Sequence, residues 1–186
     1  YANRDNEAFQ ALNAEMRFLT AKPVIYAANL SEDDLGDDNQ YVEAAKSVAA
    51  AQGAEIITLC AKLEAEMVRL SDEERAEYME LYGIQVSGLK KLLQTGYRML
   101  GLISYFSFND NEVRAWTIHE GWTAPQAAGV IHTDFERGFI RAEVIPFATF
   151  EKHGDRNAVQ AAGEMQVEGK EYIVHDGDVI NFRFNV

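Results

Sequence analysis

A short apolar run after a proline constrains the first part of the chain more than any other feature. Val24 to Ala28 follow Pro23 directly, and the run ends at the polar residue Asn29. An apolar run of this length indicates a strand that is buried on both faces, as strands of parallel sheets are. Because open α/β sheets bind ligands at the carboxyl ends of their strands, residues 29–32 are candidates for a binding site.

The next elements predict a βαβ unit. Residues 39–52 form an alanine-rich amphipathic pattern that ends at Gly53, and Ile56 to Cys60 are a second apolar run. The order strand, helix, strand indicates two parallel strands joined by a right-handed crossover. At the end of the second strand, Cys60 has an ordinary interpretation as a small buried residue, because free cysteine is one of the most buried residue types.

The residues that follow the two strands have the spacing of a nucleotide-base reader. Asn29 precedes Glu32 by three residues, as in the Asn-Lys-x-Asp motif of P-loop GTPases, and residues 60–62 (Cys-Ala-Lys) stand where those proteins carry Ser-Ala-Lys. An asparagine amide can both donate to and accept from a purine edge. Leu30 and Glu32 replace the motif's Lys and Asp, which disfavours guanine. The alternative is that Ser31 and Glu32 simply begin a helix.

The charge of the chain argues against a general nucleic-acid surface. The net charge is −13 over 186 residues, so an RNA contact would need a local basic patch. Residues 87–101 carry Lys90, Lys91 and Arg98 without any acid, which makes this predicted helix a candidate, although a solvated helix face explains it as well. Leucines and a tyrosine are expected on the apolar side of the same helix.

Other features of the composition indicate a soluble protein of one or two small domains. Hydrophobic residues make up 47% of the chain and charged residues 25%. No apolar run approaches the roughly 20 residues of a membrane helix, and no segment resembles a secretory signal. The single cysteine suits a reducing compartment, so we expect a cytoplasmic location and no membrane partner. Because the chain starts at Tyr1 and enters directly on a helical pattern, we expect a piece of a longer protein.

The composition changes near residue 102 and predicts an α+β module of about 85 residues. Strands are expected at 105–108, 113–118 and 139–147, with a turn at 109–111 and helices within 123–130 and 150–163. In the third strand, Ile140, Ala142 and Val144 form one alternating set. The end of the chain predicts a hairpin of residues 172–174 and 179–184 around Asp176-Gly177, a favoured turn pair.

Three side chains of this module have competing interpretations. His132 with Asp134 could be a proton-transfer pair, but no nucleophile or metal cluster accompanies them, so a turn that closes onto Phe135 as a core anchor is preferred. Trp116 and Trp122 could stack on bases. We expect Trp116 in the core and Trp122 exposed in a polar turn.

Several long motifs, in this order, resemble the Obg-like ATPase (YchF) family. The segments at 112–118 (EVRAWTI), 123–144 (TAPQAAGVIHTDFERGFIRAEV), 157–163 (NAVQAAG) and 172–185 (YIVHDGDVINFRFN) look like the TGS domain of that family. Residues 22–32 (KPVIYAANLSE) and the strand that ends in Cys60-Ala61 resemble the end of its nucleotide-binding domain.

The resemblance implies a fold in two parts. Residues 1–101 would be an α/β, partial P-loop NTPase, which is a Rossmann-like βαβ unit with further helices. Within it, residues 1–18 would contain the helix that returns from a helical insertion. Residues 102–186 would be an α+β TGS domain with a β-grasp, or ubiquitin-like, fold.

The resemblance also implies a function. Members of the family bind ATP with Mg²⁺, hydrolyse it often in preference to GTP, and associate with ribosomes. By position, Asn29, Leu30 and Glu32 would line the adenine pocket, with Cys60 and Ala61 close by. The possible RNA or partner contacts are Lys90, Lys91, Arg98 and His132.

The largest departure from the family is a missing motif. The phosphate-binding sequence GxxxxGK[ST] does not occur in the 186 residues. We therefore expect this chain alone not to hydrolyse ATP appreciably and to hold no catalytic or metal-binding residue of its own. The alternative is a non-catalytic TGS-type module that binds the ribosome or RNA.

Overall fold

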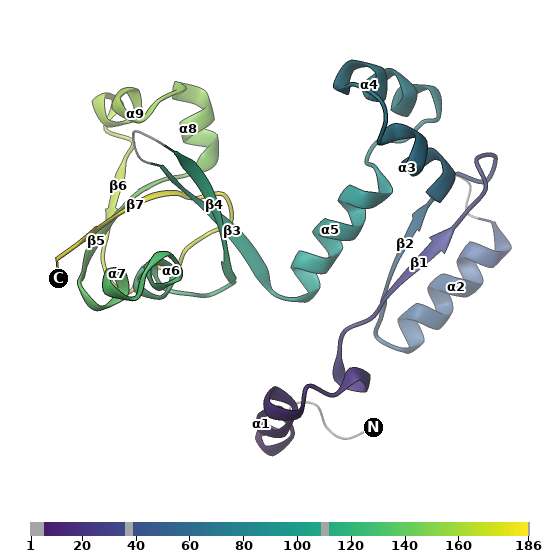
Figure 1. The fold of residues 1–186 in the computed structure, drawn as a ribbon, viewed down its shortest axis with the longest axis horizontal. Coiled ribbons are helices and arrows are strands. Elements are labelled where there is room, and N and C mark those ends of the chain that lie inside the picture. The colour runs from purple at the N-terminus through teal and green to yellow at the C-terminus, as the bar shows by residue number, and fades with distance from the viewer. Residues whose placement is uncertain (1–5, 36–38, 109–111, 186) are drawn as a thin grey trace. The chain divides into compact units, whose positions relative to one another are not determined.

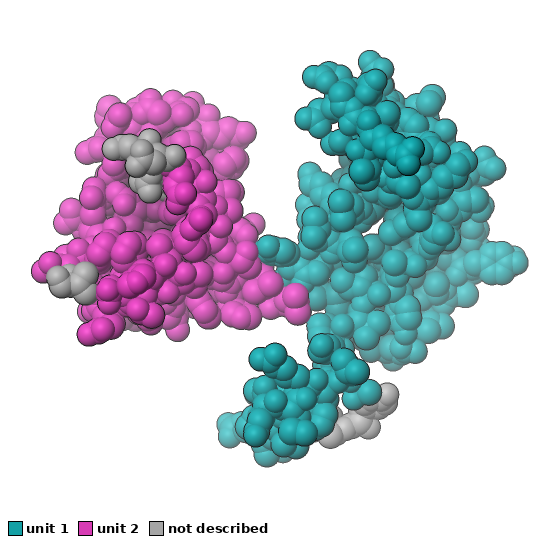
Figure 2. All heavy atoms as spheres, in the orientation of Figure 1, with its two compact units in different colours: residues 1–99 teal, residues 100–186 magenta. Residues whose placement is uncertain are grey.

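The computed structural model describes residues 6–35, 39–108 and 112–185. The chain forms two compact units, residues 1–99 and residues 100–186, each with its own sheet. Figure 2 colours the two units separately. The turn predicted at 109–111 lies outside the described residues. Across the described ranges, no helix combines the length and the apolar character needed to span a membrane.

The first unit is built on the predicted βαβ arrangement (Figure 1). Strands β1 (Ile25–Asn29) and β2 (Glu55–Leu59) pair in parallel from Ile25↔Glu55 to Asn29↔Leu59. The crossover between them is α2 (Gln40–Ala51). The other described elements are α1 (Glu7–Met16), the 3-10 helix η1 (Leu19–Ala21), α3 (Ala61–Met67), α4 (Asp72–Leu81) and α5 (Gly88–Met99).

Local sequence explains where α2 begins and ends. The Asn39 side chain accepts from the backbone N–H groups of Tyr41 and Val42 at 3.0 and 3.1 Å, which satisfies two donors that a helix start leaves unpaired. After the helix, Gly53 has a φ of 62°, a left-handed conformation that glycine adopts without steric cost. The chain thereby turns back to run parallel to β1.

Burial of β1 differs from the prediction. The strand was expected to be buried on both faces, but Val24 just before it is 48% exposed and Tyr26 within it is 37% exposed. Only two strands form this sheet among the described residues, so β1 has a strand neighbour on one side only. Helix α2 packs on both strands, whereas α5 packs on β2. An apolar run predicts a strand, but the elements around it decide its burial.

The second unit contains a five-stranded mixed sheet in the order β4-β3-β7-β5-β6. Strand β3 runs parallel to β7, and the other neighbouring pairs are antiparallel. Its elements are β3 (Leu102–Phe108), β4 (Val113–His119), α6 (Ala124–Ile131), α7 (Thr133–Arg137), β5 (Phe139–Ile145), α8 (Phe147–His153), α9 (Arg156–Ala162), β6 (Gln166–Glu168) and β7 (Val179–Phe184).

The core of the second unit lies between this sheet and α6. Three alanines of α6 are fully buried, and small side chains allow the helix to approach the sheet closely. The Tyr105 side chain lies in the core, and its hydroxyl donates to the backbone oxygen of Ala127 at 3.0 Å. The largest fully buried side chains of this unit are Tyr105, Ile118, Ile145, Ile180, Val144, Val159 and Val174.

Two predicted strand features of this unit are wrong. Residues 172–174 do not form a hairpin with β7. Ile173 forms an isolated antiparallel bridge with Thr123, and β7 pairs with β3 and β5. Ile140 does not share a buried face with Ala142 and Val144, since it is 55% exposed. A register shift between Phe139 and Arg141 interrupts the alternation of side chains in β5.

The prediction for Trp116 is confirmed, whereas the prediction for Trp122 is wrong. Trp116 packs against the core as predicted, and its Nε1–H donates to the Ser107 hydroxyl at 2.7 Å. Trp122 was expected to be exposed but also packs against the core, partly buried. The Val174 N–H donates to the Trp122 carbonyl at 3.0 Å. This long-range bond fixes the turn, so the ring lies against the core although its neighbours in sequence are polar.

Candidate functional site

The carboxyl ends of β1 and β2 lie together at one edge of the parallel sheet. The last register pair is Asn29↔Leu59, and the Leu30 N–H donates to the Leu59 carbonyl at 2.8 Å. The pairing therefore continues one residue past the end of β1. This edge is the place where open α/β sheets bind ligands, and it carries the residues that sequence analysis selected.

Asn29 joins the two strand ends through its side chain. Its Oδ1 atom accepts from the backbone N–H of Ala61 at 2.9 Å, across 32 residues of sequence. Because a backbone N–H must meet an acceptor, this bond fixes the orientation of the amide. The oxygen is engaged with the chain, and the NH₂ group of Asn29 is directed away from that bond as a hydrogen-bond donor.

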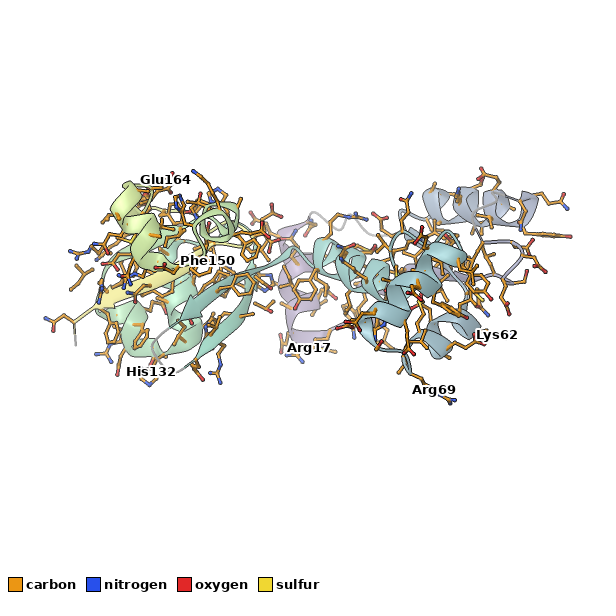
Figure 3. All side chains as sticks on the ribbon, turned by 90° about the horizontal axis from the view of Figure 1, so that it is seen from above. Arg17, Lys62, Arg69, His132, Phe150 and Glu164 are labelled. Atoms are coloured by element: carbon orange, nitrogen blue, oxygen red, sulfur yellow. The ribbon has the colours of Figure 1, made fainter. Side chains whose placement is uncertain are left out.

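Glu32 forms an ion pair with Lys62. The Lys62 Nζ contacts the Glu32 Oε1, and the hydrogen bond and charge of that carboxylate raise the pKa of Lys62 above its ordinary value. Lys62 is labelled in Figure 3. Lys62 was not among the predicted site residues. Its position directly after Cys60-Ala61, where the GTPase motif also has Lys, was the signal that could have found it.

Cys60 and Ala61 form the start of α3. The Cys60 residue is 4% exposed, so its thiol lies inside the unit, in agreement with the ordinary interpretation of a buried residue at the end of a strand. Its backbone carbonyl accepts from the Glu64 N–H at 3.0 Å, the first bond of the helix. At this edge Ala61 therefore contributes a backbone N–H, whereas the side chain of Cys60 contributes packing.

A cavity of about 310 Å³ lies beside Asn29 on the α2 side. It is lined by Ala28, Asn29, Leu30, Ser31, Asp34, Asn39, Tyr41 and Val42. Of the five predicted site residues, Asn29 and Leu30 line this cavity, and the other three do not. The structure thus brings the predicted residues to one sheet edge through backbone and side-chain bonds, but it does not place all five around one hollow.

A metal site has no support in the described part of the chain. Within residues 6–35, 39–108 and 112–185, no group of three or more His, Cys, Asp or Glu side chains could hold a metal ion. Asp34, which lines the cavity at the sheet edge, accepts from the Ser31 hydroxyl at 2.5 Å.

The predicted basic contact residues lie on two different elements. Lys90, Lys91 and Arg98 belong to α5, where Arg98 forms an ion pair with Glu55 of β2 at 3.1 Å. The leucine side of α5 is largely exposed, since Leu89 and Leu93 are 58% and 55% exposed. Among the described elements, α5 packs on β2 and α3, and its buried residues are Gly88 and Thr95.

His132 has a structural role at the start of α7. Its Nδ1 atom accepts from the Asp134 N–H at 3.2 Å, so the ring caps the helix. Phe135 stacks on Phe184 with ring centroids 3.8 Å apart and packs against the core. These contacts agree with the predicted turn that closes onto Phe135.

Comparison with known proteins gives consistent matches in sequence and structure. Residues 102–185 match the family model YchF-GTPase_C, which is described as a protein of unknown function (DUF933). The ribosome-binding ATPase YchF of Haemophilus influenzae is 47% identical over 182 residues, covering 98% of this chain and 50% of that protein. The protein of the same name from Bacillus subtilis is also 47% identical, with 97% and 50% covered.

A solved structure of a protein with the same family name is also similar to this chain. The Schizosaccharomyces pombe YchF GTPase has a TM-score of 0.81 and 36% identity, over 97% of this chain and 49% of that one. The parallel βαβ unit and the mixed sheet thus define an α/β protein related to P-loop NTPases. Within that class, the chain belongs to the YchF, or Obg-like ATPase, family. It spans about half the length of the curated relatives that it matches.

Proposed function

We propose that this chain supplies the base-recognition edge of a ribosome-associated NTPase that binds and hydrolyses ATP, and GTP less well. The relatives that match it are named ribosome-binding ATPases, which supports the ribosome as partner and a cytoplasmic location. The proposal divides the chain into the C-terminal part of a nucleotide-binding domain, residues 1–101, and a TGS domain, residues 102–186.

The single observation that carries the proposal is the bond between Asn29 and Ala61. With Oδ1 held by the Ala61 N–H at 2.9 Å, the Asn29 NH₂ group is prepared to donate to N7, an acceptor that adenine and guanine share. Preparing a donor before the ligand arrives lowers the entropic cost of binding. Asn29 would therefore bind a purine and would not by itself choose between the two bases.

Selectivity would come from Leu30 and Glu32. A carboxylate that discriminates for guanine must accept from two adjacent N–H groups on the base, but the Glu32 carboxylate is already paired with Lys62. Leu30 offers an apolar side chain where the GTPase motif has a charged one. Both features lower the advantage of guanine, which supports a preference for ATP.

The topology of the second unit supports its assignment as a β-grasp TGS domain. In chain order the five strands take the spatial order second, first, fifth, third, fourth, with the first and last strands parallel at the centre. Helix α6 follows the first hairpin and packs on one face of the sheet. This is a helix held by a mixed sheet, as the resemblance implied.

In this proposal, the triphosphate and its Mg²⁺ would be held by parts of the protein other than these 186 residues. When bound, Mg²⁺ would neutralise charge on the phosphates. The residues of this chain would orient the base and leave phosphate chemistry to the remainder of the protein. Accordingly, we expect no appreciable ATP hydrolysis by the 186-residue chain alone.

The experiment that tests the proposal converts the base reader. Leu30→Lys together with Glu32→Asp restores the GTPase motif, and it should shift relative affinity towards GTP in a competition titration of the intact protein. As a control, Leu93→Lys together with Glu73→Asp makes the same two changes at exposed residues away from the edge. Unchanged relative affinities for ATP and GTP after the reader conversion would refute the placement of the site.

The alternative proposal is a non-catalytic TGS-type module that binds the ribosome or RNA. In this alternative, the whole protein has no phosphate-binding motif. Nucleotide binding separates the two proposals. If the chain sediments with ribosomes but the Asn29 edge does not respond to ATP in a binding experiment, the module without nucleotide chemistry is the better account.

A further inference from the structure

A cluster of arginines surrounds one buried carboxylate in the second unit. Glu143 of β5 is 7% exposed and accepts from Arg156 Nη2 at 2.6 Å, and from Arg183 Nε and Nη2 at 3.0 and 3.1 Å. Asn181 donates to it at 3.2 Å, and Arg141 Nη2 lies 3.7 Å away. We call Arg141, Arg156 and Arg183 with Glu143 the arginine face.

The strand register places these side chains on one face of the sheet. Glu143 lies opposite Asn181, and Arg141 lies opposite Arg183 across the β5–β7 pair. Their sequence neighbours, such as Ala142 and Phe182, point to the other face and belong to the core under α6. Arg156 reaches the same carboxylate from the first residue of α9. Three separate elements thus bring cations to one point.

The charges of this cluster do not balance. Burial alone would raise the pKa of Glu143, but the hydrogen bonds and charges of Arg183, Arg156 and Asn181 outweigh burial and hold that pKa below its ordinary value. The carboxylate is therefore ionised near neutral pH and contributes one negative charge against three positive ones. Residues 102–186 contain 7 basic and 13 acidic side chains, so three of the seven cations gather here within an acidic unit.

The guanidinium groups retain donors for a second anion. The Arg141 and Arg183 side chains are 51% and 47% exposed, and that of Arg156 is 29% exposed. Arg183 directs two nitrogens to Glu143, and Arg156 directs one, whereas each guanidinium has five N–H groups. Glu143 fixes the positions of the cations, and their planar forks suit phosphate oxygens.

We propose that the arginine face binds the phosphate backbone of RNA. The inference rests on the proposed association with the ribosome and gives that contact a surface and a chemistry. Like-charged guanidinium groups held around one carboxylate repel one another, and a bound phosphate relieves that repulsion. A partly exposed set of cations from two strands and a helix fits an extended polyanion better than a small enclosed ligand. Earlier candidates on α5 and at His132 lie on other elements.

Arg141 is the residue to change first. Its nearest contact with Glu143 is the longest of the three, so Arg141→Gln leaves the hydrogen bonds from Arg156, Arg183 and Asn181 in place. The matched control is Arg137→Gln on α7, which removes the same charge from a side chain that is 79% exposed and 3.9 Å from Asp134. Unchanged midpoints of tryptophan-detected unfolding would show that both variants are folded.

The measurement is fluorescence anisotropy of a labelled RNA duplex with the 186-residue chain, between about 50 and 200 mM salt. Arg141→Gln should weaken binding roughly fivefold and lower the slope of log affinity against log salt by about 1, whereas Arg137→Gln should leave both near the wild-type values. Equal effects of the two variants, or no effect of either, would overturn the proposal.

Two further experiments are needed. The first distinguishes RNA from a small phosphate anion as the ligand, and the second distinguishes failure of the arginine face from failure of the proposed ribosome association. Inorganic phosphate at matched ionic strength should not displace the RNA; displacement would identify a small-anion site and overturn the RNA assignment. Sedimentation with ribosomes tests the arginine face and the proposed ribosome association separately. If Arg141→Gln sediments as the wild type does, the arginine face is not the contact, although the proposed function stands. If the wild type does not sediment, the proposed ribosome association fails, whatever the RNA duplex shows.

Discussion

The two units of this chain differ in how completely they bury their apolar side chains. In the second unit, buried residues form two packed clusters on either side of a five-stranded sheet. In the first unit, a two-stranded sheet carries few fully buried side chains, and large apolar side chains of β1 and α5 are exposed. The buried hydrophobic residues of the first unit are Val42, Ala49, Ile57, Cys60, Leu63 and Met67.

The difference in burial suggests different roles for the two units: the second has a packed core, and the first carries the candidate base site. The second unit has the elements of a self-sufficient core, so its fold should withstand changes on its surface. The first unit carries the candidate base site on an edge that is held by a few specific bonds, such as that between Asn29 and Ala61. Core substitutions in the second unit should therefore act on stability, whereas substitutions at the sheet edge of the first unit should act mainly on binding.

The largest effect is expected from Ile180→Ala in the core of the second unit. Ile180 is fully buried in β7, and shortening such a side chain costs about 2–5 kcal/mol of unfolding free energy. Ile140→Ala is the matched control on β5, because Ile140 is 55% exposed and should cost at most about 1 kcal/mol. Both tryptophans lie in this unit, so urea unfolding followed by tryptophan fluorescence reports it alone. Similar costs at the two positions would contradict the described core.

A smaller loss is expected from Glu143→Gln, and it should depend on pH. The folded pKa of Glu143 lies below its ordinary value of 4.5, so the unfolded state binds the proton more readily. Its contribution is present above that value and is lost as the pH falls through the folded pKa. At neutral pH the substitution should cost about 1–3 kcal/mol, since charged hydrogen bonds are replaced.

The pH profile of unfolding checks this prediction. Between about pH 6 and pH 3, the wild-type unit should lose more stability than the Glu143→Gln variant, so the two curves should converge at low pH. Parallel curves would show that the arginines do not depress this pKa. Glu151→Gln is a suitable control, because Glu151 is an exposed acid in the same unit.

Asn29 should contribute a modest amount to stability and a larger amount to binding. Asn29→Ala removes the bond to the Ala61 N–H and should cost about 0.5–1.5 kcal/mol. Asn29→Asp keeps an acceptor for that N–H but replaces the outward donor with an oxygen. The aspartate variant should therefore retain slow hydrogen exchange at the Ala61 amide and still lose affinity for ATP. Retained affinity in Asn29→Asp would remove Asn29 from the base site.

The smallest effect is expected from Lys62→Gln. The ion pair with Glu32 is exposed, and exposed pairs contribute little to stability because water and salt screen them. Hydrogen exchange at the Ala61 amide should be unchanged in this variant, in contrast to Asn29→Ala. A change as large as that caused by Asn29→Ala would mean that the ion pair, and not the amide bond, holds the two strand ends together.

Features encoded by local periodicity could be predicted from the sequence. The apolar runs before Asn29 and Ala61 identified two strands, and the alanine-rich segment between them identified the crossover helix. Parallel pairing then followed from chirality and connection length, which brought the two candidate segments to one edge. The sequence therefore predicted the position of Asn29 and its neighbours, though not the bond to Ala61.

Features that depend on distant partners could not be predicted in this way. The exposure of Tyr26 depends on which elements cover β1, and the burial of Trp122 depends on a bond to Val174. The arginine face was missed for the same reason. It requires the register of β5 against β7 and the position of α9, and neither is visible in the residues around Glu143.

The most direct test of the central claim is an amide NMR titration of the ¹⁵N-labelled chain with ATP and, separately, with GTP. The account predicts that ATP shifts the amide signals of Leu30 and Ala61 at the edge of the parallel sheet, that GTP shifts them less at equal concentration, and that Asn29→Asp abolishes both responses. Signals that respond equally to the two nucleotides, or only in the second unit, would contradict the claim that β1 and β2 end in an adenine-selective base site.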